Sequence, residues 1–474
     1  MTFRSKTMAD TAAPARGQRA PLRTRAIAMT AAAAVALSAL PARAQKSGGL
    51  PVIRDAEIEQ LLRDYTNPIL KAAGLGQHNI RVVIINDRSY NAFVMDGRRI
   101  FVNAGALMES ATPNQIIGVL AHETGHIAGG HLSKLRQELA NVQTAMLLAM
   151  LLGMGAVVAG RGSGNAAAAA LAAPQHIAMR SLLAYQRQHE EQADKAGVKF
   201  LAATGQSAKG MYDTFKRFAD QILFTSRYID PYVQSHPMPR ERIEALSTLA
   251  ANSPYWNKKD PPELQLRHDL MRAKLHGFLD RPDTLARAYP PSDTSLPGRY
   301  ARAIAAYRHG SVANALAQID SLIHAHPGNP YFHELKGQAL LEAGRPAEAV
   351  APLRQAISLA PNPTLMQVML GQALIATNNP RNADEAVANL EKAIARDPDI
   401  PDAYTNLAMA YGRKGDLAKA DLASAQAAFS RGDFMTARQL AARAKGRFPI
   451  GTPGWVKADD IASFKPPSAP IMGR

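Results

Sequence analysis

The run His122-Glu123-Thr124-Gly125-His126 sets the expectation for the first half of this chain. Residues four apart on a helix project from nearly the same face, so the two imidazoles can bind one metal ion. Glu123 lies one step round the helix, where its carboxylate can contact a water on the metal instead of the metal itself. The chain contains no cysteine, so only histidine and carboxylate side chains are available as metal ligands. Zinc accepts such ligands, and the motif therefore predicts a catalytic zinc site on a helix.

A catalytic zinc site needs a third protein ligand, and two residues are candidates. His131 follows His126 by five residues, about 140° away from the ligand face if the helix continues, so we interpret it as a solvent-facing or helix-end histidine. Glu190, in Glu190-Glu191-Gln192-Ala193-Asp194, is the better candidate. Asp194 lies one turn further on the same face, where it can accept the second ring N–H of a ligand histidine.

Hydrophobic periodicity around the motif predicts a small sheet and several helices. The expected strands are Ile80–Ile85, Asn91–Met95 and Arg99–Asn103, with Asp96-Gly97 as a two-residue turn between the last two. The expected helices are Asp55–Ala73, Gln115–Leu135 and Met179–Ala203. These elements predict an α+β, mainly α fold for a first domain that spans residues 51–251.

The second half of the chain repeats with a period of 34 residues. Gly-Gln-Ala-Leu occurs at 337–340 and again at 371–374, and Pro327 recurs as Pro361. Each unit predicts an alanine-rich helix pair and resembles the tetratricopeptide repeat, whose stacked pairs form an α-solenoid. This resemblance covers about 298–450. The Pro-, Asp- and Arg-rich residues 252–297 are expected to be a linker, and 451–474 a C-terminal tail.

Residues 1–44 predict a secretory signal peptide. Arg23 and Arg25 precede the apolar run Ala26–Leu40, and the small residues before Gln45 fit cleavage after Ala44. The run is shorter than the roughly 20 apolar residues that span a bilayer, which favours a cleaved signal over an anchor helix. We therefore expect an exported, periplasmic protein.

The composition bounds the remaining possibilities. The chain has 474 residues, 47% of them hydrophobic and 20% charged, which is typical of a folded protein of two or three domains. Its formal net charge is +16, of which residues 1–44 supply six units and the rest +10. Nucleic acid is not an expected partner, because the chain is predicted to be exported and has no recognised binding motif. The remaining charge suits an anionic envelope surface or acidic clients.

The chain resembles the CAAX prenyl protease-like family of zinc metallopeptidases in its His122–His126 motif, its Glu190–Asp194 segment and its export signal. The resemblance covers essentially all of 51–450, and is to those members that are periplasmic and carry C-terminal repeats. It implies a zincin-type metallopeptidase domain with a small β-sheet that holds one Zn²⁺ per chain through His122, His126 and Glu190. In such a site the bound water has a lowered pKa, and Glu123 would take its proton during attack on a peptide carbonyl.

The same resemblance assigns roles to two residues near the end of the first domain. His236, in Ser235-His236-Pro237, is expected to approach the active site, and Arg242 to brace it. His236 would either donate a hydrogen bond to the oxyanion of the tetrahedral intermediate or coordinate the zinc and keep the enzyme latent. A loop histidine with no role is the plainer alternative.

By resemblance, Asn91, Ala92 and Phe93 lie in the edge strand of the active site. An extended substrate can pair with the free N–H and C=O groups of such a strand. An interior strand with no role in binding is the alternative.

An uncharged stretch at Val142–Gly160 is close to spanning length. The expected ligands His122 and His126 precede this stretch and Glu190 follows it, and all three must meet at one ion. An odd number of membrane crossings between them is therefore excluded. A second span over 166–183 would contain Pro174 and Arg180. We favour a pair of apolar helices joined by Gly160–Gly164, serving as a lid or as a surface for an unfolded client or for peripheral membrane contact. Packing into the core is the alternative for 142–183.

Two functions follow as expectations. The first is a periplasmic zinc endopeptidase that hydrolyses misfolded or stalled envelope proteins, with the repeats recruiting clients. The second is a chaperone or assembly adaptor with a mostly latent peptidase. The resemblance implies, as partners, unfolded or misassembled envelope proteins and the machinery of outer-membrane β-barrel assembly or lipopolysaccharide export.

Overall fold

A small sheet and the helices around it form the first half of the chain in the computed structural model, which describes residues 50–158, 164–224 and 231–465. The predicted signal peptide and its cleavage site therefore lie outside the described residues. The sheet has four strands in the order β1-β2-β4-β3, namely β1 (Val52–Ile53), β2 (Arg81–Ile85), β4 (Arg99–Asn103) and β3 (Ala92–Val94). Strands β2 and β4 are parallel, and the other two pairs are antiparallel.

Strand β3 is at one edge of this sheet, so the alternative of an interior strand is wrong. It pairs with β4 so that Phe93 faces Phe101, and the two rings stack at 5.3 Å between centroids. The connection is four residues long, longer than the predicted two-residue turn. The Asp96 carboxylate accepts hydrogen bonds from the backbone N–H groups of Arg98 and Arg99, and Gly97 has φ 72°. Asp96 therefore stabilises the turn in place of further strand pairing.

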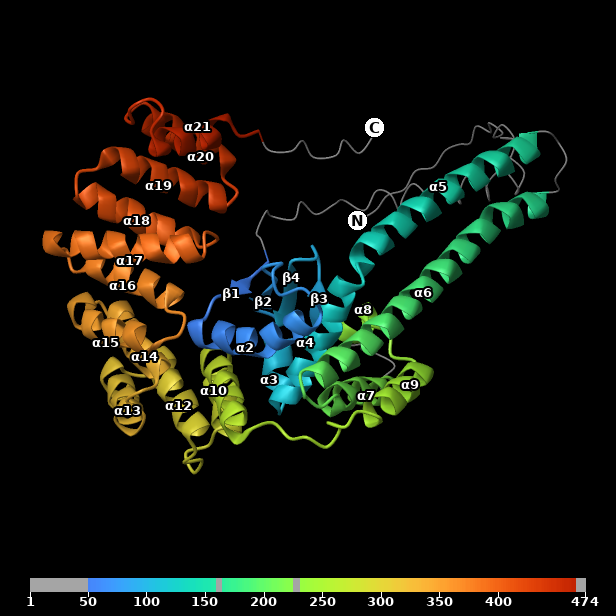
Figure 1. Ribbon diagram of the computed structural model, residues 1–474, viewed down its shortest axis with the longest axis horizontal. Helices are drawn as coiled ribbons and strands as arrows, with labels where there is room; N and C mark the ends of the chain where they lie inside the picture. Colours follow the sequence, from blue (N-terminus) through green and yellow to red (C-terminus); the bar gives the residue numbers. More distant parts are fainter. Residues whose placement is uncertain (1–49, 159–163, 225–230, 466–474) are drawn as a thin grey trace, which may run out of the picture. The chain divides into compact units, whose positions relative to one another are not determined.

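Eight helices of the described chain accompany the sheet (Figure 1). They are α2 (Ala56–Ala72), α3 (Ala104–Glu109), α4 (Pro113–Ala128), α5 (His131–Val158), α6 (Gly164–Ala203), α7 (Lys209–Phe224), α8 (Pro231–Ser235) and α9 (Arg240–Ala251). The core between them is built from apolar residues of α2, the sheet, α4 and α7. The zinc motif lies on α4, whose first turn is closed by a capping box of Thr112 and Gln115.

The helix predicted over Gln115–Leu135 is in fact two helices. Gly130 adopts φ 61°, a left-handed conformation that ends α4 and lets α5 begin at His131 in a new direction. Helices α5 and α6 lie side by side (Figure 1). The structure describes no side chain between 145 and 182, so the lid, core and membrane-contact interpretations of 142–183 fall largely outside the described residues. In the part of the chain that is described, no helix combines the length and apolarity needed to cross a bilayer.

The stretch expected to be a linker contains two helices, α10 (Pro262–Leu279) and α11 (Pro282–Ala288). Proline stands at the first position of both helices, where its missing N–H is not needed for helical hydrogen bonding. Helix α10 packs against α2 of the sheet domain and α12 of the repeats. It is therefore an ordered element between the two halves.

A buried ion cluster, which we call the junction cluster, joins these helices. The Lys274 ammonium of α10 lies 2.8 Å from Asp55 Oδ2, 3.3 Å from Glu57 Oε2 and 3.8 Å from Glu334 Oε2. Asp55 and Glu57 belong to the start of α2 and Glu334 to the repeats, and the Tyr300 hydroxyl donates to Glu57. One cation is thus shared by three carboxylates from two halves of the chain.

The second half is a stack of helix pairs, which confirms the predicted α-solenoid (Figure 1). Its elements are α12 (Leu296–His309), α13 (Val312–Ala325), α14 (Pro330–Glu342), α15 (Pro346–Leu359), α16 (Thr364–Ala376), the 3₁₀ turn Pro380–Asn382, α17 (Ala383–Arg396), α18 (Pro401–Arg413), α19 (Leu417–Ser430), α20 (Phe434–Lys445) and α21 (Pro453–Ser463). The last of these helices lies within the segment expected to be a tail.

The glycines of the repeated tetrapeptide show why the period is kept. A Cβ on Gly337 would lie 2.5 Å from Leu353, and a Cβ on Gly371 would lie 2.6 Å from Leu390. Both leucines are on the second helix of the respective pair, so a glycine lets the two helices approach closely at the same place in successive repeats.

Candidate metal centre

Four side chains from three segments converge in the first half of the chain. We call His122 and His126 of α4, Glu190 of α6 and His236, which follows α8, the metal cluster. One ligand atom from each lies within 4.8 Å of all the others. His122, Glu190 and His236 are buried, and His126 is partly exposed. The structure thus brings together the three predicted ligands and His236, which was expected to approach the active site.

The distances within this cluster fit a small metal ion. His122 Nε2 and His126 Nε2 are 3.0 Å apart. The Glu190 carboxylate oxygens lie 3.4 Å from His122 Nε2 and 3.5 Å from His126 Nε2. Ligand atoms of a tetrahedral zinc site are about 3.3 Å apart, given zinc–ligand bonds of about 2.0–2.1 Å. Two imidazole nitrogens and a carboxylate also form a donor set that zinc prefers, so the residues fit the ion that the motif predicts.

Close contact between α4 and α6 places Glu190 opposite the histidines. A Cβ on Gly125 would lie 2.7 Å from the Ala193 carbonyl oxygen of α6. The glycine inside the motif therefore allows the two helices to meet at the level of the ligands. Burial raises the pKa of Glu190, but His236, His122 and Arg242 around it outweigh this effect and hold the pKa well below its usual range. Glu190 is accordingly ionised, as a metal ligand must be.

Glu123 is fully buried beside the metal cluster. Among the described residues its Oε1 accepts no hydrogen bond, and His236 Nε2 lies 3.4 Å away. Burial raises the pKa of Glu123, while His236 and His122 lower it to a smaller extent. A carboxylate with a raised pKa and a free acceptor oxygen is suited to taking a proton from a water near neutral pH.

Asp194 and Arg242 support the cluster from behind. Asp194 Oδ1 lies 2.9 Å from His122 Nδ1, the ring nitrogen that faces away from the other ligands. Arg242 donates to both Asp194 oxygens at 2.7 and 2.8 Å, and its Nη1 lies 2.9 Å from Glu190 Oε2. Burial raises the pKa of Asp194, but the Arg242 guanidinium outweighs it, and the net shift is downward. A charged acceptor is therefore held beside His122 Nδ1.

His236 lies among the ligand atoms of the site. Its Nδ1 is 3.0 Å from Glu190 Oε2 and 3.3 Å from His122 Nε2. Its Nε2 is 3.3 Å from the carbonyl oxygen of Ala92 in β3. Arg242 also donates to the Pro237 carbonyl at 2.9 Å, which fixes the loop that follows the histidine.

The edge strand presents one of its carbonyl groups to His236. The Asn91 carbonyl accepts from Asn103 N–H of β4, so the Ala92 carbonyl points to the opposite, open side of β3. Asn91 Oδ1 and Ser235 Oγ are 3.5 Å apart, and Phe93 stacks on its neighbour in β4. The three residues predicted for substrate contact are therefore at the side of the sheet nearest the metal cluster.

His131 is at a helix end, as one part of the interpretation stated, because α5 begins at this residue. It is 4% exposed, and its Nδ1 lies 3.1 Å from His126 Nδ1, so the interpretation as a solvent-facing histidine is wrong. The error came from extending α4 through Gly129-Gly130, where the helix ends and the chain turns the ring back towards the motif. Burial and the neighbouring His189 lower the pKa of His131 to about 4, so the ring is neutral. The glycine pair was the signal that could have corrected the prediction.

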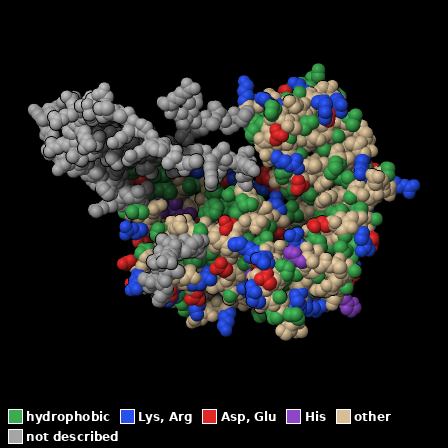
Figure 2. All heavy atoms as spheres, turned by 180° about the vertical axis from the view of Figure 1, so that it is seen from behind, with side chains coloured by type: hydrophobic (Ala, Val, Ile, Leu, Met, Phe, Trp, Pro, Cys, Tyr) green, Lys and Arg blue, Asp and Glu red, His purple; other side chains and the backbone are tan. Residues whose placement is uncertain are grey.

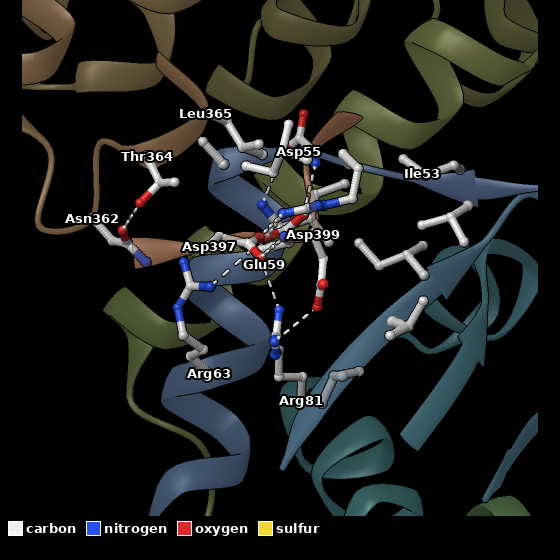
Figure 3. A pocket seen from close by; sticks show the side chains of 18 of the residues that line it. Ile53, Asp55, Glu59, Arg63, Arg81, Asn362, Thr364, Leu365, Asp397 and Asp399 are labelled. Carbon is white, nitrogen blue, oxygen red and sulfur yellow. Dashed lines mark hydrogen bonds and ion pairs between the residues drawn. The ribbon is translucent and has the colours of Figure 1, made fainter. Parts of the chain in front are cut away.

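A separate groove with a volume of about 1710 Å³ lies between α2, β2 and the repeat helices. Figure 3 shows Arg81 beside Asp397 and Asp399, with dashed lines between their side chains. Arg54 also pairs with Asp397 at 2.7 Å. No residue of the metal cluster lines this groove, which is therefore distinct from the candidate metal centre.

Comparisons with known proteins agree with this geometry. The family model "Peptidase family M48" matches residues 53–250, and tetratricopeptide repeat models match 300–363 and 389–439. The chain is 24% identical over 350 residues to the beta-barrel assembly-enhancing protease of Escherichia coli (strain K12), covering 72% of this chain and 69% of that protein. It is 21% identical over 380 residues to the protein of the same name from Yersinia pestis, covering 78% and 76%. It is also 27% identical over 190 residues to the metalloprotease YcaL of Escherichia coli (strain K12), covering 39% and 68%.

These matches confirm the predicted zinc metallopeptidase with C-terminal repeats. Residues 53–250 match the model of peptidase family M48, and the chain is a zinc metalloprotease that joins this domain to an α-solenoid of tetratricopeptide repeats.

Proposed function

We propose that this protein is a periplasmic endopeptidase that hydrolyses misfolded or stalled envelope proteins, and that its repeats recruit clients or assembly partners. The observation that carries the proposal is the metal cluster with the buried Glu123 carboxylate beside it. The name of the two relatives, beta-barrel assembly-enhancing protease, supports clients or partners in outer-membrane β-barrel assembly. The export signal over 1–44 supports the periplasmic location. The proposal also includes the lipopolysaccharide-export machinery as a partner and contact of the protein with a membrane surface.

We assign the peptidase to 51–251 and the repeats to 298–450. The chain segment between them includes α10, which carries Lys274 of the junction cluster. Acidic and basic side chains are interspersed over the face shown in Figure 2, which supports protein clients in preference to nucleic acid.

One Zn²⁺ per chain would be held by His122, His126 and Glu190. When bound, it lowers the pKa of a coordinated water towards neutrality. Glu123 accepts the proton of the attacking water and returns it to the departing amine. Asp194, braced by Arg242, keeps the Nδ1 proton on His122, so that Nε2 remains free to coordinate.

The substrate would bind as an added strand along Asn91 and the β3 residues Ala92 and Phe93. The Ala92 carbonyl points to the open side of the strand, where an extended peptide can donate to it. Main-chain pairing of this kind gives affinity with little dependence on side chains, which suits unfolded clients of varied sequence.

His236 holds the site in a latent state under this proposal. It lies among the ligand atoms and contacts the same Ala92 carbonyl that a substrate strand would use. His236 must therefore leave the ligand atoms and the Ala92 carbonyl before a peptide can bind. We expect His236→Ala to raise the rate at which purified protein cleaves an unfolded substrate. A loss of turnover would instead favour the role of a hydrogen-bond donor to the oxyanion.

The variant Glu123→Gln tests the catalytic assignment. We expect it to retain zinc and to lose about 10²–10⁴-fold in cleavage of an unfolded protein, because the amide cannot take a proton. Glu191→Gln is the matched control, since Glu191 is an exposed neighbour of the ligand on α6 and should leave the rate unchanged. Cleavage by Glu123→Gln at the wild-type rate would contradict the assignment.

A chaperone or assembly adaptor with a mostly latent peptidase is the second candidate. The position of His236 among the ligand atoms favours it. Complementation of a deletion strain separates the two functions. Rescue by the Glu123→Gln allele supports the adaptor, and failure of that allele supports the protease.

A further inference from the structure

The two histidines of the motif differ in what supports the ring nitrogen that faces away from the metal. His122 Nδ1 has the Asp194 carboxylate at 2.9 Å. His126 Nδ1 has another imidazole nitrogen, His131 Nδ1, at 3.1 Å. The other nitrogen of that partner ring, Nε2, lies 3.2 Å from Gln192 Oε1. A chain of three side chains therefore leads from His126 to α6.

With His126 bound to a metal through Nε2, one arrangement of protons satisfies this chain. A ligand histidine that coordinates through Nε2 carries its proton on Nδ1. His126 Nδ1–H then donates to the lone pair of His131 Nδ1, so that His131 carries its proton on Nε2. This N–H donates to Gln192 Oε1, an atom that only accepts. The amide oxygen at the end of the chain thus selects the tautomer in which His126 can bind a metal.

Packing fixes the orientation of the His131 ring. It stacks on His189 with 4.3 Å between ring centroids and 7° between planes, and His189 in turn contacts Tyr185 at 4.1 Å. Gly129 leaves the space that the ring occupies, because a Cβ there would lie 2.2 Å from His131 Nε2. A fixed ring offers its Nδ1 lone pair in one direction, towards His126.

We propose that His131, held by Gln192, is a positioning residue that sets the tautomer and orientation of the ligand His126. The proposal rests on the proposed function, in which His122, His126 and Glu190 hold the zinc. It gives α6 a further role, because Gln192 and Asp194 stand on this helix together with Glu190. One helix then supplies a ligand and orients both histidines of the other.

Zinc affinity is the direct test, measured on the purified protein by competition with a chromogenic chelator. His131→Phe keeps the size of the ring and removes the acceptor, so we expect a loss of about 10–100-fold in affinity. Gly129→Ala should give a similar loss, because its methyl group displaces the His131 ring while both imidazoles remain. Gln192→Met should lose only about a few-fold, since Gln192 is exposed and water can replace its oxygen. Gln192→Glu retains an acceptor and should bind zinc like the wild type.

A spectroscopic measurement separates positioning from a general structural effect. We expect the visible absorption of the Co²⁺-substituted protein to shift in His131→Phe, while the far-UV circular dichroism of the metal-free variant matches that of the wild type. Adding Gln192→Met to His131→Phe should cost nothing further, because the chain is already broken. Glu191→Gln is again the control and should change neither readout.

Equal zinc affinity and equal cobalt spectra for the wild type and His131→Phe would overturn the positioning role. If His131→Phe does not fold, the positioning role would be overturned by wild-type zinc affinity in both Gly129→Ala and Gln192→Met. A wild-type protein that binds no zinc at all would contradict the metal site itself, which is a different failure.

Discussion

The metal cluster and the junction cluster are two buried groups whose carboxyl side chains have pKa values shifted in opposite directions. In the metal cluster, Glu190 and the supporting Asp194 have lowered pKa values, since the cations around them outweigh burial. In the junction cluster, burial raises the pKa values of Glu57 and Glu334, and Lys274 offsets this only in part. The first group keeps its carboxylates ionised, whereas burial in the second shifts Glu57 and Glu334 towards the neutral form.

This difference follows from the number of cations that each group contains. Arg242 contacts both Glu190 and Asp194, and the histidines add further positive potential. Lys274 alone faces three carboxylates. A site that must hold a metal needs ionised ligands, whereas a contact between domains has no such requirement.

Removing the single cation of the junction cluster should have the largest effect on stability. We expect Lys274→Met to lower the free energy of unfolding by about 3–5 kcal/mol, because the buried carboxylates of Glu57 and Glu334 and the partly exposed one of Asp55 lose their shared cation. Urea denaturation measures this loss. Zinc affinity should be unchanged, since none of the metal-cluster residues contacts Lys274 among the interactions described.

Arg81→Met is the matched control for that experiment. Arg81 also joins the two halves, through Asp397 and Asp399, but its side chain is 42% exposed. Exposed ion pairs contribute about 0–1 kcal/mol, so the change should be small and should decrease with added salt. Equal losses in Lys274→Met and Arg81→Met would mean that burial does not set the strength of the junction.

The stability should also depend on pH, by a few kcal/mol at most. Burial, partly offset by Lys274, raises the pKa of Glu334 from 4.5 to about 8. Between these values the folded protein binds more protons than the unfolded chain, so stability falls as pH rises from about 5 to 8. We expect Glu334→Gln, which resembles the neutral carboxyl, to flatten this dependence in urea denaturation. A wild-type slope in the variant would show that Glu334 is not the group responsible.

A smaller effect is expected from the support of the metal cluster. Asp194→Asn retains the shape but removes the charge that faces His122 and Arg242, so zinc affinity should fall by about 10–100-fold. Chelator competition measures the change. Unfolding of the metal-free protein at pH 7 should change less than in Lys274→Met, and the reverse order would contradict the distinction between the two clusters.

Two pairs of residues at the metal cluster were predictable because each pair is local, whereas the place of His236 was expected only from the family resemblance. His122 and His126 are one helical turn apart, as are Glu190 and Asp194, so helix geometry alone places each pair on one face. The recurrence of Gly337 and Gly371 likewise predicted the helix pairs, since each glycine meets a leucine of the second helix. Short-range spacing of this kind can be recognised in a single sequence.

The junction cluster could not be predicted in this way. Its residues come from the start of α2, from α10 and from α14, and no spacing along the chain relates them. The proline-rich composition around α10 also suggested a linker, although proline at the first position of a helix is compatible with helical structure. The burial of His131 was missed for a similar reason, because it depends on the turn at Gly130 and on side chains of α6.

The most direct test of the account is to locate zinc in crystals of the metal-loaded protein from anomalous scattering at the zinc edge. The account predicts one zinc per chain, bonded to Nε2 of His122, Nε2 of His126 and the Glu190 carboxylate, with Glu123 unbound beside it. A protein that holds no zinc between these three residues, or holds it elsewhere, would contradict the account.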